Sequence, residues 1–293
     1  MKKTLGILAA TGLLATGLAA CSSDAASSGS SKIVIGSQDY YSNEIVAEIY
    51  AQTLEEKGFS VDRDFRIGQR EVYMSDVESG NINLFPEYTG PLLQYWQPDS
   101  TVTKSDDVYA ALVQAAPDNL QILHQSPATD QDSYVVTREF ADKYNVHSLA
   151  DLKALNIPIT IGGNSELESR PNGPKGLKAS YDLDVSFTPI EDGGGPLTIK
   201  ALKDNSVQLA LVYTADPSIK SNDLVVLDDP AAMFRASNLV PIASKDLDSG
   251  AVDAINTVSE KLTTDDLVSM NSESVNDQKS ASDIAAEWLE KNS

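Results

Sequence analysis

Short apolar runs alternate with helical spacing along residues 32–85. Residues 32–36 form an apolar run of strand length, and residues 59–68 and 82–85 return to strand character. Between them, apolar residues recur at helical spacing from Ile45 to Leu54, and residues 72–79 follow a second helical pattern. We expect Ser42 to cap the first helix, and Gly58 and Gly80 to end the two helices. This alternation predicts a parallel or mixed sheet covered on both faces.

The same alternation restarts after residue 148. Ser148, with Asp151 three residues later, has the pattern of a capping box. The pattern then predicts strands over 157–161, 185–190 and 207–213, with a turn at Gly162–Gly163. It predicts helices over 176–181, over 197–203 and from Ala251 to the end. Short apolar runs follow at 224–227 and 239–243. Two α/β units followed by terminal helices predict two lobes with a cleft between them.

The N-terminal residues have the pattern of an export signal. Lys2 and Lys3 precede an apolar stretch over residues 5–20, which is short for a membrane span and long enough for a signal-peptide core. The stretch ends in Leu-Ala-Ala-Cys at Cys21, which resembles the lipobox of bacterial lipoproteins. We therefore expect a lipoprotein signal peptide at 1–20, a lipid on Cys21 and a Ser/Ala/Gly-rich tether over 21–31. A plain secretory signal with an incidental cysteine is the alternative.

Composition narrows the possible functions. The chain has 293 residues, 41% of them hydrophobic, which is enough to bury a core and excludes wholesale disorder. Its formal net charge of −21 repels nucleic-acid phosphates, so we expect no nucleic-acid partner. With one cysteine and two histidines, an intramolecular disulfide and a histidine-rich metal site are both excluded. No metal or cofactor is expected.

The sequence contains no motif that indicates a catalytic site. No Gly-x-Ser-x-Gly sequence is present, and neither His124 nor His147 lies near a candidate nucleophile in sequence. The run Gly193–Gly195 lacks the lysine of a phosphate-binding loop and predicts a turn. Glu191 and Asp192 are adjacent carboxylates, but in so acidic a chain such a pair is expected by chance and does not indicate an acid/base site. We therefore predict that the protein is not an enzyme and has no catalytic residue.

Three motifs and a short tract carry a family resemblance. They are Gly-Ser-Gln-Asp-Tyr-Tyr-Ser-Asn-Glu-Ile at 36–45, Phe-Pro-Glu-Tyr-Thr-Gly at 85–90, Ser-Arg-Pro-Asn-Gly-Pro-Lys-Gly-Leu at 169–177 and Val-Tyr-Thr-Ala-Asp at 212–216. Together they resemble the substrate-binding lipoproteins of osmoprotectant ABC importers, which bind glycine betaine, choline, carnitine and related quaternary ammonium compounds. The resemblance runs in order over most of residues 33–229 and fades in the C-terminal helices.

The resemblance implies a set of ligand contacts. A trimethylammonium group carries charge without an ordinary hydrogen-bond donor, so aromatic faces hold it better than neutral polar groups do. An arginine fork suits the carboxylate at the other end of a betaine. By the family's motifs, Tyr88, Tyr134 and Tyr213 correspond to the aromatic cage, Arg170 to the carboxylate site, and Gln38 to a residue of the first loop that approaches the ligand.

Two positions depart from the family's pattern. Pro91 stands where the family usually has a threonine, so one polar contact is missing. A further cage tyrosine is expected near Ala236, where this chain has no aromatic residue; Phe234 could turn in instead, or the cage is open there. An open cage would weaken the binding of glycine betaine and leave space for a larger ligand, such as carnitine.

These observations give one overall expectation. The fold is α/β, a two-lobed periplasmic-binding-protein fold of type II with the ligand cleft between lobes formed by 32–126 with 239–293, and by 130–235. The protein is expected to be a lipid-anchored monomer on the extracytoplasmic face of the cell membrane, with a Gram-positive surface favoured. There it captures a quaternary ammonium solute for an ABC permease.

Two other functions stay open. One is the binding of an amino acid or other small zwitterion, in which Asp39 or Asp216 would meet a primary ammonium group. The other is a surface lipoprotein that acts as an adhesin or receptor, for which the two lobes are only a scaffold.

Overall fold

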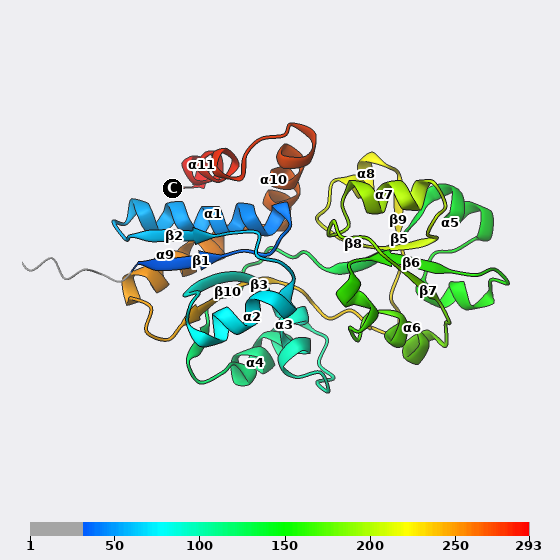
Figure 1. Ribbon diagram of the computed structural model, residues 1–293, viewed down its shortest axis with the longest axis horizontal. Coiled ribbons are helices and arrows are strands. Elements are labelled where there is room, and N and C mark those ends of the chain that lie inside the picture. The colour runs from blue at the N-terminus through cyan, green and yellow to red at the C-terminus, as the bar shows by residue number, and fades with distance from the viewer. Residues whose placement is uncertain (1–31, 293) are drawn as a thin grey trace, which may run out of the picture. The chain divides into compact units, whose positions relative to one another are not determined.

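Strands from both ends of the chain form the first of two mixed sheets. A computed structural model describes residues 32–292 (Figure 1). The sheet has the order β2-β1-β3-β10-β4, with β1 (Ile33–Gly36), β2 (Val61–Asp64), β3 (Leu84–Tyr88), β4 (Leu120–Ile122) and β10 (Leu239–Ser244). Strand β1 runs parallel to β2 and β3, whereas β10 runs antiparallel to β3 and β4. We call this sheet and its helices the first lobe.

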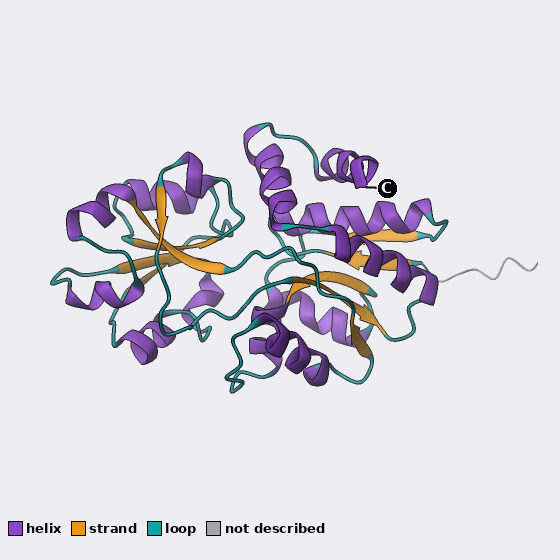
Figure 2. Cartoon of the chain, turned by 180° about the vertical axis from the view of Figure 1, so that it is seen from behind, coloured by secondary structure: helices purple, strands orange, loops and turns teal. Residues whose placement is uncertain are grey.

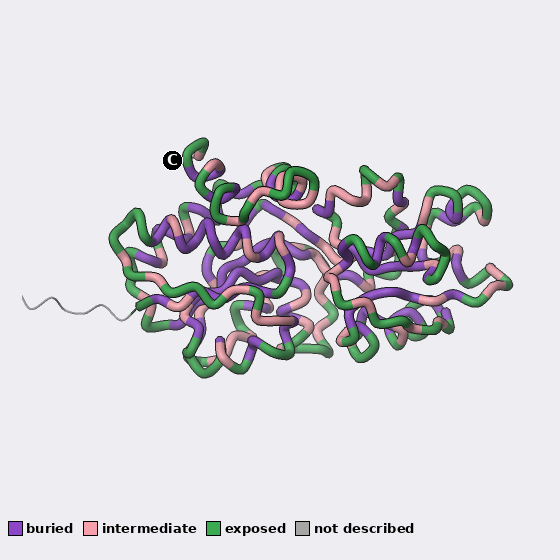
Figure 3. Tube along the Cα trace, turned by 45° about the horizontal axis from the view of Figure 1, so that its top comes forward, coloured by how far each residue is buried: buried purple, intermediate pink, exposed green. Residues whose placement is uncertain are grey.

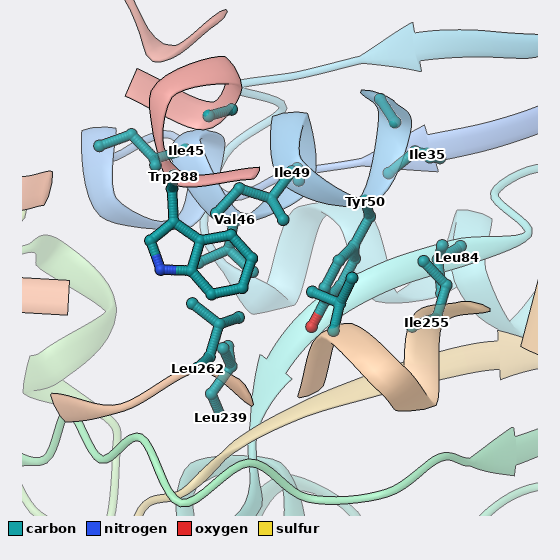
Figure 4. Packing of buried hydrophobic residues seen from close by; sticks show 14 of the residues in the cluster. Ile35, Ile45, Val46, Ile49, Tyr50, Leu84, Leu239, Ile255, Leu262 and Trp288 are labelled. Carbon is teal, nitrogen blue, oxygen red and sulfur yellow. The ribbon is translucent and has the colours of Figure 1, made fainter. Parts of the chain in front are cut away.

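Helices cover both faces of this sheet because its central strands β1, β3 and β10 carry buried residues on both sides. On one side lie α1 (Tyr41–Glu56), α9 (Ser249–Lys261), α10 (Thr264–Asn276) and α11 (Ala281–Asn292); on the other lie α2 (Arg70–Ser79), α3 (Thr89–Trp96) and α4 (Ser105–Ala115). Ile33 and Ile35 pack into the first cluster and Val34 into the second, as the two-residue period of a strand requires. Figure 4 shows Trp288 of α11 beside Ile45 and Val46 of α1.

The second lobe has the same kind of architecture, a mixed sheet with helices packed against it. Its sheet has the order β7-β6-β8-β5-β9, with β5 (Asp132–Thr137), β6 (Thr160–Gly163), β7 (Ser186–Pro189), β8 (Leu209–Tyr213) and β9 (Leu224–Val226). Its helices are α5 (Arg138–Tyr144), α6 (Pro174–Tyr181), α7 (Pro196–Lys203), α8 (Ser218–Ser221) and the 3₁₀ turns η1 (Leu149–Ala154) and η2 (Ser165–Glu168). Separate apolar clusters fill the two sides of this sheet, and Figure 3 traces its buried strands in purple.

Two segments cross between the lobes and pair with each other. Residues 123–131 lead from β4 to β5, and residues 227–238 lead from β9 back to β10 (Figure 2). Thr129 and Asn238 form an antiparallel bridge, and the backbone N–H of Asp130 donates to the carbonyl of Ser237 at 3.1 Å. The crossing is therefore a short two-stranded ribbon rather than two independent linkers.

The α/β, two-lobed fold class is confirmed, with local differences. Ser42 does not cap α1, since the helix begins one residue earlier and its N-cap is Tyr40, without a side-chain hydrogen bond. Gly162 and Gly163 continue strand β6 instead of turning out of it. Helices α3, α4 and α5 were not anticipated. The capping box at Ser148 is confirmed.

Other expectations stay predictions. The exact lobe boundaries stay predictions, and the signal peptide, Cys21 and the tether lie outside the described residues. Within residues 32–292, no helix has the length and apolar character needed to cross a bilayer.

The first lobe's core gives a stability prediction. Ile49 of α1 is fully buried, whereas Val113 of α4 is 46% exposed. We expect Ile49→Ala to lower the free energy of unfolding by about 2–5 kcal/mol, because it leaves a cavity that neighbours fill only in part. Val113→Ala should stay within about 0.5 kcal/mol. Urea unfolding followed by circular dichroism measures both, and equal losses would show that Ile49 does not belong to the core.

Candidate functional site

A small cavity lies where both lobes and both crossing segments meet. It is lined by Gln38, Tyr40, Arg70, Tyr88, Pro91, Asp130, Asp132, Arg170, Tyr213 and Ser237. Its volume is about 20 Å³, roughly the space of one water molecule. Four of the five ligand residues expected from the sequence are among these ten. Tyr134 is the one that is not.

The loop after β1 is fixed by a buried asparagine. Asn43 Oδ1 accepts a hydrogen bond from the backbone N–H of Gln38 at 2.8 Å, and Asn43 Nδ2 donates to the carbonyl of Pro86 at 2.9 Å. Asn43 therefore ties the Gln38 loop to strand β3, directly before Tyr88. This explains why the first motif extends into helix α1, beyond the residues that line the cavity.

Tyr88 is oriented by a buried ion pair beneath it. Glu87 accepts two hydrogen bonds from the Arg70 guanidinium, at 2.6 and 2.9 Å, and one from the Tyr73 hydroxyl at 2.5 Å. Its carboxylate also accepts from the backbone N–H of Tyr88 at 2.7 Å. Burial acts to lower the pKa of Arg70, but the carboxylate of Glu87 outweighs it and raises that pKa well above its usual value. Glu87 is therefore a structural residue, and Tyr88 faces the cavity.

The surroundings of Tyr88 bring the first lobe and the second crossing segment together. The Tyr88 side chain is buried, and its hydroxyl lies close to the hydroxyl groups of Tyr40 and Ser42. Gly90, the last residue of the same motif, passes close to the second crossing segment: a Cβ there would lie 2.6 Å from the carbonyl of Ala236. Only glycine allows this approach, which brings β3 and residues 235–237 together at the cavity.

Tyrosines from the two lobes stack across the cavity. The rings of Tyr40 and Tyr213 have their centroids 5.1 Å apart and an interplanar angle of 26°. Tyr213 is the last residue of β8, at the carboxyl end of a strand, where ligands bind in open α/β sheets. Tyr40 precedes α1 and belongs to the first motif, although the family resemblance assigns it no ligand contact. Its stack with Tyr213 makes it the third ring of the cavity.

Arg170 reaches across to the first lobe. Its Nε and Nη2 atoms donate to the carboxylate of Glu71 at 3.0 and 2.8 Å, and Nη2 also donates to Gln69 Oε1 at 3.2 Å. Burial acts to raise the pKa of Glu71, but the hydrogen bonds from Arg170 outweigh it and hold that pKa below its usual value. A Cβ at Gly173 would lie 1.8 Å from the carbonyl of Leu167, so the tight loop that carries Arg170 requires that glycine.

Two aspartates complete the cavity, and neither was proposed from the sequence. Asp130 is 4% exposed, and its Oδ1 accepts from the backbone N–H of Ala215 at 2.8 Å. Burial raises the pKa of Asp130 to about 8, and no cationic side chain of the described chain opposes this. Asp132 is half-buried and accepts from Asn172 Nδ2 at 2.9 Å. Burial raises the pKa of Asp132 too, against the opposing fields of Arg170 and Arg70.

Other candidate residues lie elsewhere. Tyr134 is fully buried in the second lobe's core, donates through its hydroxyl to the carbonyl of Asn172 at 2.7 Å, and packs on Phe234 with ring centroids 5.5 Å apart. Phe234 therefore does not take the place of the missing cage tyrosine. Asp216 accepts from the Tyr41 hydroxyl at 2.5 Å, and Asp39 is exposed and accepts from Gln69. Neither of these acids lines the cavity.

The site suits an organic ligand better than a metal ion. Across residues 32–292, no group of three or more His, Cys, Asp or Glu side chains is arranged to hold a metal. Three tyrosine rings, two carboxylates and two arginine side chains instead line the cavity and offer contacts for a small molecule with a charged end.

Comparison with known families identifies the chain. Residues 31–291 match the model of the substrate-binding domain of the ABC-type glycine betaine transport system. The chain belongs to this family. It is therefore the substrate-binding component of an ABC transport system, which acts outside the cytoplasm, and the family consists of transport proteins rather than enzymes.

Individual relatives of this family are similar to the protein over most of its chain. The carnitine transport binding protein OpuCC of Listeria monocytogenes is 26% identical over 275 residues, which cover 90% of this chain and 88% of the relative. A crystal structure of a glycine betaine/carnitine/choline ABC transporter has a TM-score of 0.70 at 21% identity, covering 89% and 98% of the two chains. Lactococcal OpuAC, closed on glycine betaine, has a TM-score of 0.66 at 16% identity, covering 89% and 96%.

The ion pair beneath Tyr88 gives a second prediction. Glu87→Gln should lower the free energy of unfolding by about 3–5 kcal/mol, because it leaves the buried Arg70 charge without its partner. The matched variant is Glu55→Gln, which removes a 42% exposed carboxylate that also pairs with an arginine, Arg63; it should cost no more than about 1 kcal/mol. Urea unfolding of the ligand-free protein measures both, and a small loss for Glu87→Gln would contradict the assigned role of this pair.

Asp130 gives a third prediction, on pH dependence. Its pKa of about 8 in the folded protein lies above the value of about 3.9 in an unfolded chain. The stability that this group contributes is therefore present below about pH 4 and is lost as the pH rises through 8. Asp130→Asn lacks this titration, so the variant should gain stability relative to wild type between pH 5 and 8.

The control for this titration is a second aspartate of the second lobe. Asp184 accepts from Lys178 Nζ at 2.8 Å on the surface and lies outside the cavity. Urea unfolding at pH 5, 6.5 and 8 compares the two variants with wild type. A stability difference for Asp130→Asn that does not change with pH would show that Asp130 ionises freely in the folded protein.

Proposed function

We propose that the protein captures a quaternary ammonium osmoprotectant of the betaine, choline or carnitine type and delivers it to an ABC permease. The observation that supports this most is the convergence of Tyr40, Tyr88 and Tyr213 on one cavity. Each aromatic face contributes roughly 0.5–2 kcal/mol to the binding of a desolvated cation. Arg170 and Gln38 border the same cavity as polar contacts for the ligand's other end.

The ligands of two relatives belong to the same chemical class. OpuCC of Listeria monocytogenes is a carnitine-binding protein, and lactococcal OpuAC was solved with glycine betaine. In this chain the Arg170 guanidinium already pairs with Glu71, but its Nη1 atom makes no hydrogen bond with any described residue. A ligand carboxylate would bind at that edge of the guanidinium.

Ligand entry requires the lobes to separate. A cavity of about 20 Å³ is much smaller than any trimethylammonium compound, and the centroids of Tyr40 and Tyr213 lie 5.1 Å apart. The two lobes supply opposite walls, and the paired crossing segments are the natural hinge. The Arg170–Glu71 and Tyr41–Asp216 contacts then join the lobes on closing, which excludes water and strengthens every charge contact inside.

The location follows from the N-terminal sequence pattern and remains a proposal. We infer that the protein is a lipoprotein whose Cys21 carries the lipid, with 21–31 as tether and the two lobes as a monomeric body over 32–126 with 239–293, and 130–235. Lipid anchoring is the usual solution where no outer membrane retains soluble binding proteins, which favours a Gram-positive surface.

The alternatives have less support. An amino acid would bring its primary ammonium to Asp39 or Asp216, yet both lie outside the cavity, and Asp216 already binds Tyr41 and the backbone of Ser218. An adhesin would leave the three converging tyrosines without a role. The binding test described next distinguishes amino-acid binding and an adhesin role from the proposed function.

The fourth prediction tests the aromatic cage. Tyr88→Leu and Tyr213→Leu keep an apolar side chain but remove the aromatic face, so each should weaken the binding of choline and glycine betaine about two- to thirtyfold. Isothermal titration calorimetry on the purified variants measures the dissociation constants. Tyr144→Leu is the matched control, because Tyr144 packs on Phe140 in the second lobe, away from the cavity.

Three results would count against the proposal. Unchanged binding in Tyr88→Leu and Tyr213→Leu would remove the cage from this cavity. Binding of amino acids alone would keep the transport role and change the ligand class. The absence of binding to any of these solutes would favour the adhesin.

A further inference from the structure

The charges around the cavity are not balanced. Arg70 is held by Glu87 through two hydrogen bonds, and Arg170 is held by Glu71 through two more. Both guanidinium groups therefore already have carboxylate partners from the protein. Asp130 has no such partner within the described chain, although it is more deeply buried than Arg170.

The groups that act electrostatically on Asp130 are aromatic or anionic. They are Tyr40, Tyr41, Tyr88, Tyr213, Asp132 and Asp216. Arg70 and Arg170 also line the cavity with Asp130, but their guanidinium groups pair with Glu87 and Glu71. Burying an unpaired carboxylate among aromatic rings raises the free energy of the folded protein unless a cation is present, because no other contact compensates for the lost hydration.

The backbone around Asp130 holds this carboxylate in place. Its N–H donates to the carbonyl of Ser237, its carbonyl accepts from the Ser237 hydroxyl at 2.9 Å, and its Oδ1 accepts from the N–H of Ala215. Oδ2 is left for a ligand, and the buried Tyr88 side chain lines the same cavity. A ligand ammonium placed among the three rings would lie beside Oδ2.

We propose that the Asp130 carboxylate is the counter-ion of the bound ammonium, and that the site therefore prefers a net cation of the choline class to a zwitterion of the betaine class. This inference rests on the proposed function and narrows its ligand. A zwitterion brings a carboxylate that must share Arg170 with Glu71 and lie near Asp132, whereas the choline hydroxyl meets no such repulsion.

Binding should also move a proton. Burial holds Asp130 largely protonated below pH 8, and a bound cation favours the ionised form. The binding of choline at pH 6.5 should therefore release close to one proton. Its affinity should fall by as much as tenfold per pH unit below 8.

The experiment compares three probes by calorimetry at pH 8.5. Choline and glycine betaine share the trimethylammonium group, and 3,3-dimethylbutanol is the uncharged isostere of choline. In the wild-type protein, choline should bind at least tenfold more tightly than either of the others. In Asp130→Asn its advantage over the isostere should fall at least tenfold, while Asp184→Asn should behave as wild type.

Proton release supplies a readout that needs no variant. Choline titrations of the wild-type protein at pH 6.5, in two buffers of different ionisation enthalpy, should show a proton released on binding, and the isostere should show none. A betaine that binds as tightly as choline, an Asp130→Asn variant with wild-type choline affinity, or binding without proton release would each overturn the inference while leaving the proposed function standing. If none of the quaternary ammonium probes binds, the proposed function fails, and this inference fails with it.

Discussion

The hydrogen-bonded pairing of the two crossing segments is the contact on which the rest of the site depends. Residues 126–130 and 237–239 bond to each other through backbone and side chains, with the Ser126 and Asp130 N–H groups donating to the carbonyls of Leu239 and Ser237. Thr89 joins the same ribbon through its backbone N–H, which donates to the Asn238 carbonyl. The ribbon thus connects the two sheets, carries Asp130, and holds the start of α3 against the cavity.

Around that ribbon, each lobe contributes groups of a different kind. The first lobe brings the rings of Tyr40 and Tyr88, set by Asn43 and by the Arg70–Glu87 pair, and the second brings Tyr213 and Arg170. Buried charges are tolerated in proteins when they are paired, and both arginines follow that rule. Asp130 does not follow it, and the exception coincides with the aromatic rings. An incomplete electrostatic arrangement of this kind is expected where a charged ligand supplies the missing partner.

Much of the site could be predicted because its residues lie in short motifs at the ends of strands. Gln38, Tyr88 and Tyr213 follow or end β1, β3 and β8, where α/β sheets place their ligands. Tyr134 has the opposite position: it lies two residues into β5, on the same side as Asp132 but about 6.6 Å further along the strand, and so reaches the core rather than the cavity.

Asp130 and Tyr40 could not be predicted in the same way. Asp130 is one of 43 acidic residues, and its burial results from the pairing of two segments about a hundred residues apart, which no local pattern records. Tyr40 adjoins a second tyrosine, and only the tertiary structure shows that Tyr40 stacks on Tyr213 while Tyr41 bonds to Asp216. Helices α3, α4 and α5 all lie within residues 86–147, outside the two stretches of alternating strand and helix on which the predicted fold rests.

A crystal structure of the complex with choline would test the account most directly. The account predicts that the choline nitrogen lies within about 6 Å of the ring centroids of Tyr40, Tyr88 and Tyr213, with the Asp130 carboxylate as its nearest anionic group. A choline nitrogen placed beside Asp132 or Glu71, or a ligand bound outside this cavity, would contradict it.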